Sequence, residues 1–434
     1  MNKKFENIDT AIPTIQDADL DDKVVLVRVD HNVVKNGEIA DPFRIDATIG
    51  TLYNIVERGG RLILMTHVGR PKDKKTGEIS IGPDTSIEPI VEYLERKLHA
   101  HFVIPEFKST SRGIDGIDTS INLHIRDLKR HEIGGIYLPN TRWFSGEEAG
   151  GEEQERFATM LSGLADVFVN DAFGSWQPHA STHNIAMQLP SYAGYLMQQE
   201  ISNLTHVLNP KRPFLAVVAG SKFDTKIGPL RELYDKVDCL ILGGVIYNTY
   251  IAAKYGVSIA GVTKKEIEMA KELVEKDSRE KKILELPIVV ESDTMDGKIE
   301  GKYRSIEIGQ LMKGDSLGYI LDIDPGSFDR REVMDTILGA GTIFVNAVMG
   351  YTPHFTEGSK ALDRAIDENR EAKKMYGGGD TLKEFKDLLP GLYLAVLDDS
   401  QYYFFTGGGA VLKAIQEGDP YGLLPVKALM EQKV

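Results

Sequence analysis

The chain has 434 residues, of which 42% are hydrophobic and 27% charged, and its 65 acidic side chains against 51 basic ones give a formal net charge of −14. This apolar content excludes wholesale disorder, and the length predicts two or three domains with their own cores. The negative charge argues against nucleic acid or an anionic membrane surface as the main partner.

The N-terminal segment has no apolar stretch of the kind that a secretory signal needs. No apolar run approaches the roughly 18 residues that cross a bilayer. Cys239 is the single cysteine, which excludes an internal disulfide framework and suits a reducing compartment. We therefore expect a soluble cytoplasmic protein.

Short apolar runs recur along the chain, and each is nearly continuous rather than alternating, as in strands buried on both faces of a parallel sheet. They cover residues 23–29, 61–65, 166–170, 213–219, 283–290, 318–323, 342–346 and 392–397. Segments with helical spacing lie between them, at 87–98, 195–208, 264–276 and 358–374. This alternation predicts a doubly wound α/β fold, and the number of strands favours two sheets in two domains.

The domain boundary is expected at the helix 195–208, because 209-NPKRP-213 breaks the helix before the next apolar strand. We therefore predict a first domain over 1–194, an interdomain helix and hinge over 195–212, and a second domain over 213–420. A C-terminal segment, 421–434, could pack back on the first domain. The acidic run 147–155 and the basic run 72–75 are interpreted as solvated loops or helix ends.

Polar side chains follow several of the predicted strands in the first half of the chain. Asp30, His67 and Arg142 each come after an apolar run, so they should lie at carboxyl ends of strands, where open α/β sheets bind ligands. The wider set is Arg28, Asp30, Asn32, Arg44, His67, Arg70 and Arg142. Several arginines beside one histidine predict a ligand that carries both carboxylate and phosphate.

Glycine is enriched, at 42 residues, and it clusters at 243–244, 377–379 and 407–409. Each cluster precedes a helix-like stretch, and glycine amides at a helix start can bind phosphate. A plain tight turn is the alternative for any one cluster. The usual nucleotide motifs are absent, because 297-GKIEGKY-303 is too short for a P-loop and 339-GAGTIF-344 lacks the third glycine of a dinucleotide fingerprint.

Seven motifs, in order, resemble those of the phosphoglycerate kinase family. They are 28-RVDHNV-33, 66-THVGRP-71, 140-NTRWF-144, 169-VNDAFG-174, 219-AGSKFDTKI-227, 377-GGGDT-381 and 405-FTGGGA-410. The resemblance implies two Rossmann-like domains joined by a helix and a hinge. It also implies that 3-phosphoglycerate or 1,3-bisphosphoglycerate binds the first domain, that Mg²⁺ with ADP or ATP binds the second, and that closure permits phosphoryl transfer. We expect a monomer.

The resemblance also assigns roles to individual residues. It implies substrate contacts by Arg28, Asp30, Asn32, Arg44, His67, Arg70 and Arg142, and catalytic roles for Arg44 and Lys222. Nucleotide contacts are implied for Gly220, Ser221, Lys222, Lys226, Gly244, Asn346, Gly350, Gly377, Gly378, Gly379, Asp380 and Thr381, with Asp380 on the metal. The amides of Gly407, Gly408 and Gly409 would stabilise the transferring phosphoryl group.

The chain departs from the family pattern at both predicted sites. Gln177-Pro178 replaces a His-Arg pair that holds the substrate phosphate, so either another residue covers the phosphate or the substrate differs. At the nucleoside, Asp324 and Val245 replace glycines and 350-GYTP-353 lacks the ribose glutamate, for which Glu357 or His354 could substitute.

Three functions remain open on these residues. The first is a phosphoglycerate kinase that uses GDP at least as well as ADP, because the rewritten nucleoside site keeps its phosphate contacts. The second is a related phosphotransferase with another nucleotide or acid. The third is a non-catalytic relative that binds ligands as a sensor.

Overall fold

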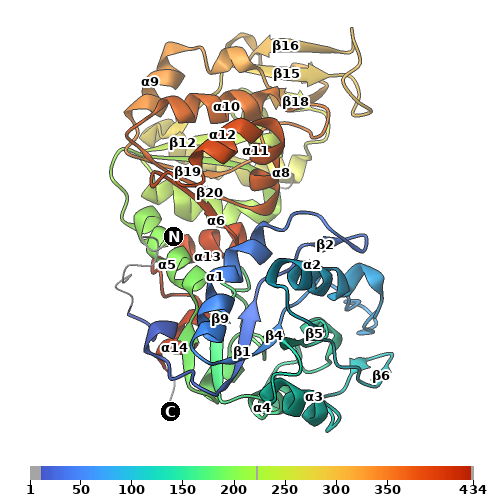
Figure 1. Cartoon of the computed structure of the whole chain (residues 1–434). Helices are drawn as coiled ribbons and strands as arrows, with labels where there is room; N and C mark the ends of the chain where they lie inside the picture. Colours follow the sequence, from blue (N-terminus) through green and yellow to red (C-terminus); the bar gives the residue numbers. More distant parts are fainter. Residues whose placement is uncertain (1–10, 221–222, 432–434) are drawn as a thin grey trace. The chain divides into compact units, whose positions relative to one another are not determined.

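The computed structural model describes residues 11–220 and 223–431. The chain divides into two compact units (Figure 1). The first holds the described residues up to Ser202 and those from Pro420 onward, and the second holds Asn203–Asp419. Among the described residues, no helix combines the length and apolar character needed to cross a membrane.

The first unit is built on a sheet of six parallel strands within the described residues, in the order β10-β9-β1-β4-β8-β5. The strands are β1 (Val24–Val29), β4 (Arg61–Met65), β5 (Phe102–Val103), β8 (Gly135–Tyr137), β9 (Val167–Asp171) and β10 (Ser191–Ala193). The central strand β1 is buried along its whole length, as its continuous apolar run predicts. Two hairpins, β2 (Val34–Lys35) with β3 (Glu38–Ile39) and β6 (Ser109–Thr110) with β7 (Gly113–Ile114), lie outside this sheet.

Helices and short 3₁₀ turns connect these strands. The helices are α1 (Phe43–Glu57), α2 (Glu88–Leu98), α3 (Ile121–Lys129), α4 (Gly151–Ser162), α5 (Tyr195–Leu208) and α14 (Leu424–Met430). The turns are η1 (Ile15–Asp17), η2 (Pro83–Thr85), η3 (Thr141–Trp143) and η4 (Asn184–Met187). Helix α1 packs on β1 and β4, and the C-terminal α14 packs on β10 and η4.

The second unit holds another six-stranded parallel sheet within the described residues, in the order β14-β12-β11-β19-β20-β21. Its strands are β11 (Phe214–Gly220), β12 (Cys239–Gly243), β14 (Ile283–Leu284), β19 (Thr342–Asn346), β20 (Lys373–Gly377) and β21 (Tyr402–Phe405). An antiparallel sheet adds β15 (Ile288–Ser292), β16 (Tyr303–Glu307) and β18 (Tyr319–Ile323), and a separate pair is β13 (Ser258–Ile259) with β17 (Ser316–Leu317).

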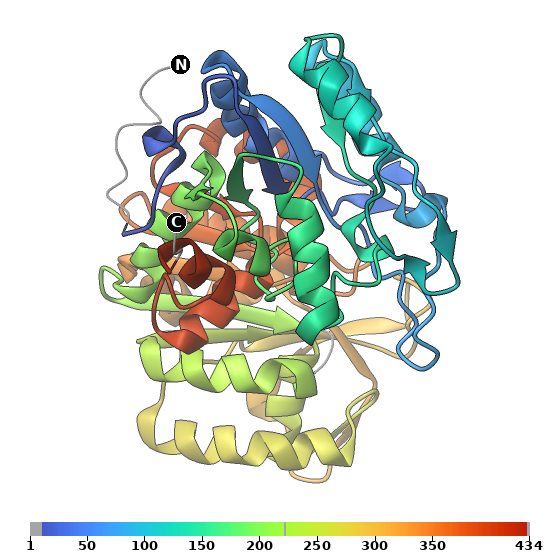
Figure 2. The same cartoon turned by 90° about the horizontal axis from the view of Figure 1, so that it is seen from below.

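The helices of the second unit pack against this framework. They are α6 (Phe223–Lys236), α7 (Gly244–Tyr255), α8 (Lys264–Glu280), α9 (Arg331–Gly339), α10 (Glu357–Glu368), α11 (Gly379–Leu388), α12 (Pro390–Val396) and α13 (Gly408–Glu417), with turns η5 (Ile308–Gln310) and η6 (Pro325–Ser327). Helices α6 and α7 contact β11, and α8, the long yellow helix at the lower edge of Figure 2, packs along α7.

The predicted fold class, two doubly wound Rossmann-like α/β sheets, is confirmed, and four element predictions are wrong. The predicted helix 358–374 ends at Glu368 as α10, and Lys373 and Lys374 begin the strand β20. The run 392–397 is not a strand but forms most of α12, and the sixth strand is β21 instead. The run 283–290 is two strands, β14 and β15, which belong to different sheets. The segment 318–323 is a strand, β18, but it pairs antiparallel with β15 outside the parallel sheet.

Candidate active site

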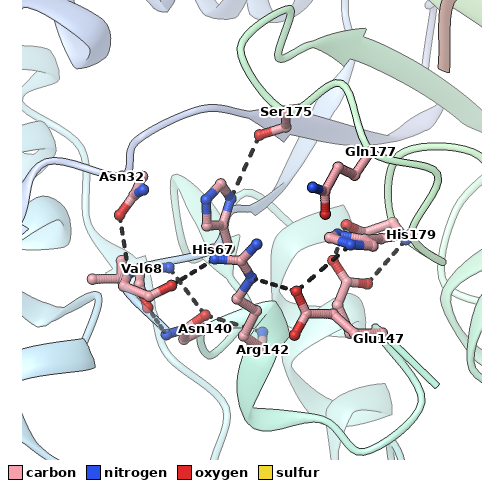
Figure 3. Close-up of polar contacts among 12 residues, drawn as sticks. Asn32, His67, Val68, Asn140, Arg142, Glu147, Ser175, Gln177 and His179 are labelled. Carbon is pink, nitrogen blue, oxygen red and sulfur yellow. Dashed lines mark hydrogen bonds and ion pairs between the residues drawn. The ribbon is translucent and has the colours of Figure 1, made fainter. Parts of the chain in front are cut away.

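The carboxyl ends of the first unit's parallel strands carry the polar side chains that follow them in sequence. They surround a cavity of about 270 Å³. Its lining comprises Asn32, His67, Gly69, Arg70, Arg142, Gly174, Ser175, Trp176, Gln177 and His179. In Figure 3 the side chains of His67, Arg142 and His179 gather around this space. Four of the seven predicted substrate residues, Asn32, His67, Arg70 and Arg142, therefore line one cavity.

Arg28, at the end of β1, lies beside this cavity but is fully buried. Its Nε donates to Ser181 Oγ (2.9 Å), and its Nη2 lies 3.0 Å from His67 Nδ1. A guanidinium can only donate, so His67 Nδ1 accepts and the imidazole carries its proton on Nε2. Burial, together with Arg28, Arg142 and Arg44, holds the pKa of His67 well below its usual value. His67 is therefore a neutral hydrogen-bond donor.

Asp30 and Arg44 form an ion pair next to the cavity. Arg44, in the first turn of α1, donates from Nη1 to Asp30 Oδ2 at 3.1 Å, and its side chain is 23% exposed. The other carboxylate oxygen, Asp30 Oδ1, is buried and has no hydrogen-bond partner. Because a buried carboxylate oxygen without a partner is costly, this atom is suited to accept a hydrogen bond from a ligand hydroxyl.

Arg142 is held in place by the loops around it. Asn140 caps η3, with its Oδ1 accepting from Val68 N (3.1 Å) and Arg142 N (3.0 Å). The guanidinium of Arg142 donates from Nη1 to Gly69 O (2.6 Å), and its Nε lies 3.0 Å from Glu148 Oε1. These contacts fix a cation at the edge of the cavity.

The acidic run 147–155 is not wholly a solvated segment, which corrects the sequence interpretation. Glu147 is fully buried, and its carboxylate accepts from the backbone N (3.0 Å) and the Oγ (2.6 Å) of Ser181. Since Ser181 Oγ also accepts from Arg28, Glu147 balances the charge of that buried arginine through one hydroxyl. The neighbouring Glu148 faces Arg142. Sequence reasoning missed both glutamates, although they directly follow the motif that contains Arg142.

In the second unit the glycine runs lie together at the carboxyl ends of its strands. Gly377 ends β20, Gly378 precedes α11, and Gly408 and Gly409 begin α13 after Gly407. A Cβ at Gly408 would lie 2.5 Å from the backbone N of Gly378, which only glycine permits. Asn346, the last residue of β19, donates from its amide to the carbonyl of Gly377.

Other predicted nucleotide residues lie at the same edge of this sheet. Gly220 ends β11 and forms a bridge with Gly244, at the start of α7. Gly350 follows β19, and Asp380 and Thr381 lie in the first turn of α11. Ser221 and Lys222 lie outside the described residues, and Lys226 belongs to α6 without a described side chain.

A magnesium ion is compatible with this arrangement. Among the described residues, no group of three or more His, Cys, Asp or Glu side chains could hold a metal. Mg²⁺ is commonly held by one or two carboxylates, waters and the substrate phosphates. Asp380, at the N-terminus of α11 beside the glycine runs, offers one such carboxylate.

The structure shows the surroundings of Asp324 and Val245, which replace glycines at the nucleoside side, and of Glu357, a possible substitute for the missing ribose glutamate. Asp324 caps η6, with Oδ1 accepting from Gly326 N (2.8 Å) and Oδ2 accepting from Ser305 Oγ. Glu357 pairs with Lys298 Nζ at 2.6 Å. Val245 is the second residue of α7. The Asp324 carboxylate therefore has a local structural use, which the sequence did not reveal.

Known proteins resemble this chain along nearly its whole length. The family model described as phosphoglycerate kinase matches residues 15–418. A phosphoglycerate kinase of Roseiflexus sp. (strain RS-1) is 34% identical over 410 residues, covering 93% of this chain and 96% of that protein. That of Dictyoglomus turgidum is 32% identical over 427 residues, covering 96% and 98%.

Solved structures of phosphoglycerate kinases also resemble this chain. Phosphoglycerate kinase from Coxiella burnetii superposes with a TM-score of 0.73 at 27% identity, covering 96% of this chain and 98% of that one. The enzyme from Pyrococcus horikoshii OT3 shares the fold, with a TM-score of 0.76, 22% identity and the same coverage. With its basic cavity in one unit and its paired glycine runs in the other, the chain belongs to the phosphoglycerate kinase family and is a kinase.

Proposed function

We propose that the chain catalyses reversible, Mg²⁺-dependent phosphoryl transfer between 1,3-bisphosphoglycerate and ADP, giving 3-phosphoglycerate and ATP. The observation that carries this proposal is the basic cavity of the first unit. Arg70 and Arg142 supply two permanent cations there, and His67 supplies a neutral donor. This set suits a small ligand that carries phosphate and carboxylate groups.

The second unit would hold the nucleotide by its phosphates. Gly377–Gly379 and Gly407–Gly409 place backbone amides at the starts of α11 and α13, where helix dipoles favour negative charge. Asp380 would hold Mg²⁺, which neutralises charge on the nucleotide phosphates when it is bound.

Phosphoryl transfer needs positioning and electrostatic stabilisation more than covalent chemistry. The carboxylate of the substrate is itself the nucleophile, so the protein need not provide a nucleophilic serine or cysteine. We assign stabilisation of the transferring group to Arg44 and Lys222, the two residues for which the family resemblance implies catalytic roles. Arg44 is partly exposed and pre-positioned by Asp30, which supports this role.

We also propose a cytoplasmic monomer. Cys239 is the single cysteine, which suits a reducing compartment. Burial raises the pKa of its thiol to about 11, so this half-buried cysteine is a poor nucleophile.

A coupled spectrophotometric assay tests the function. The purified chain with Mg²⁺ and 3-phosphoglycerate should consume ATP or GTP, and removal of Mg²⁺ with a chelator should abolish turnover. Turnover with another phosphorylated acid but not with 3-phosphoglycerate would replace the proposed substrate. Ligand binding without turnover would replace the proposed activity with a sensor role.

A further inference from the structure

The first unit's cavity contains a histidine that the implied substrate contacts do not include. The segment 174-GSWQPHAST-182 has Gln177-Pro178 where the family resemblance implies a His-Arg pair for the substrate phosphate. In the structure, Gln177 and His179 both line the cavity, and the His179 side chain is 17% exposed. The cavity thus keeps an ionisable base in the segment that lost its arginine.

Glu148 lies between this histidine and Arg142. Its Oε1 is 3.0 Å from Arg142 Nε and 3.6 Å from His179 Nε2, and its side chain is 29% exposed. One carboxylate oxygen therefore lies within ion-pair distance of both basic groups, although Arg142 Nε is buried and has no hydrogen-bond partner. A phosphate oxygen at this place could accept the hydrogen bond that this buried donor lacks. Because the Glu148 side chain is partly exposed, it can turn to solvent when a stronger anion arrives.

The charged and titratable groups facing His179 come from four places. They are Glu147 and Glu148 before α4, Arg142 in η3, Arg28 in β1 and His67 after β4. Burial, aided by Arg142 and Arg28, lowers the pKa of His179 despite the opposing effect of the two glutamates. His179 is therefore mainly neutral near neutral pH, and a bound phosphate would favour its charged form.

We infer that His179 is a phosphate-binding residue of this cavity, and that Glu148 occupies the phosphate position until the ligand displaces it. On binding, the imidazole takes one proton from solvent and becomes an imidazolium that donates to the phosphate. This inference rests on the proposed function for the identity of the ligand, 3-phosphoglycerate. In this inference His179, whose charge depends on pH, binds the phosphate in place of the arginine that the family pattern has in this segment.

The pH dependence follows from linkage. The ligand raises the pKa of His179 above that of the free protein, so the added affinity is fully present below the free-protein pKa. It is lost as pH rises through the pKa of the complex, by up to about tenfold per pH unit. Affinity for 3-phosphoglycerate should therefore weaken as pH rises above the free-protein pKa of His179, and it should level off above the pKa of the complex.

Isothermal titration calorimetry counts the protons that the protein takes up when it binds 3-phosphoglycerate. The ligand is titrated into the full chain near neutral pH, in buffers of different ionisation enthalpy. Compared with His179→Gln, the wild type should take up more protons per ligand, by a difference that approaches one. His179→Gln should weaken binding about 10- to 100-fold on the acid side of neutrality, the loss of one charge-assisted hydrogen bond, with a smaller effect at alkaline pH. His183→Gln is the matched control, because His183 is in the same segment but does not line the cavity, and it should behave as the wild type.

Two further variants separate a phosphate contact from a structural role. His179→Arg should bind 3-phosphoglycerate without the extra proton and with an affinity that no longer falls at alkaline pH. Glu148→Gln should bind it several-fold more tightly, because the competing carboxylate is gone, whereas a structural role for Glu148 would weaken binding.

The results distinguish this inference from the proposed function. Equal proton uptake by the wild type and His179→Gln, with 3-phosphoglycerate bound by both, would overturn the inference and leave the function standing. The chain could instead fail to bind 3-phosphoglycerate but still bind inorganic phosphate, with proton uptake that depends on His179. That result would overturn the proposed function and leave the phosphate site standing. Failure to bind either ligand would overturn both.

Discussion

His31 lies in the core of the first unit, and both of its ring nitrogens are hydrogen-bonded. Nδ1 is 3.0 Å from Tyr137 Oη, Nε2 is 2.9 Å from Thr48 Oγ1, and the side chain is fully buried. The family motif resembled by 28-RVDHNV-33 has phenylalanine at this position. Burial lowers the pKa of His31 to about 3, so the folded protein keeps it neutral.

His31→Phe should therefore change how stability depends on pH. The unfolded chain protonates His31 below about pH 6.5, whereas the folded protein resists until about pH 3. Stability is thus full above the unfolded pKa and falls by up to about 1.4 kcal/mol per pH unit from this residue as pH drops. His31→Phe should remove that contribution, and at neutral pH it should cost at most about 1–2 kcal/mol.

Urea unfolding of the wild type and His31→Phe across this pH range measures the difference. Parallel stability curves would contradict the account, because they would mean that His31 titrates alike in the folded and unfolded states.

The polar side chains that line the cavity could be predicted from the sequence, but the acidic groups that balance its arginines could not. Asn32, His67, Arg70 and Arg142 were predictable because they follow apolar strands, and parallel strands bring their carboxyl ends to one edge. The role of Glu147 was not predictable, since a run of acidic residues is usually solvated and only the fold buries one of them against Ser181.

Among the elements, most helices and strands could be predicted from their periodicity, except where an apolar run was ambiguous. The run 392–397 suits a helix or a buried strand equally by periodicity. Pro390, at the first position of α12, favours the helix, and Leu394 is left 69% exposed. The strand is formed instead by the aromatic residues of β21, a run too short to stand out.

Substitutions of Asp324 should change both the stability of η6 and the preference for nucleotides. Its carboxylate caps this turn and bonds Ser305, so Asp324→Gly should lose about 1 kcal/mol of stability as well as a negative charge. Asp324→Asn keeps most of the capping and removes only the charge. If the Asp324 carboxylate accepts hydrogen bonds from guanine N1 and N2, groups that adenine cannot match, both variants should raise kcat/KM for ADP relative to GDP. The wild type should then use GDP at least comparably.

Steady-state kinetics with ADP and GDP measures the effect of each variant on nucleotide preference. Thermal unfolding of the same variants measures the effect of the lost cap on stability. A strong ADP preference in the wild type, unmoved in Asp324→Asn, would leave capping as the residue's sole use.

At the scale of the whole molecule, two units with separate sheets carry the two predicted sites. The residues proposed to bind phosphoglycerate lie in the first unit and the glycine runs in the second, with α5 continuing from one unit to the other along the chain. Transfer requires the two ligands to meet, so we expect 3-phosphoglycerate and Mg-nucleotide together to compact the molecule.

Small-angle X-ray scattering checks this expectation. Either ligand alone should reduce the radius of gyration only partly, and both together should reduce it most. A radius of gyration that is unchanged with both ligands bound would contradict transfer by domain closure.

We propose that the cavity at the carboxyl ends of β1, β4 and β8 binds phosphoglycerate. A crystal structure of the chain with 3-phosphoglycerate tests it most directly. We predict the ligand in this cavity, with its phosphate within hydrogen-bond distance of Arg142 and His179 and with the Glu148–Arg142 ion pair broken. A ligand bound elsewhere, with that ion pair intact and the cavity empty, would contradict the claim.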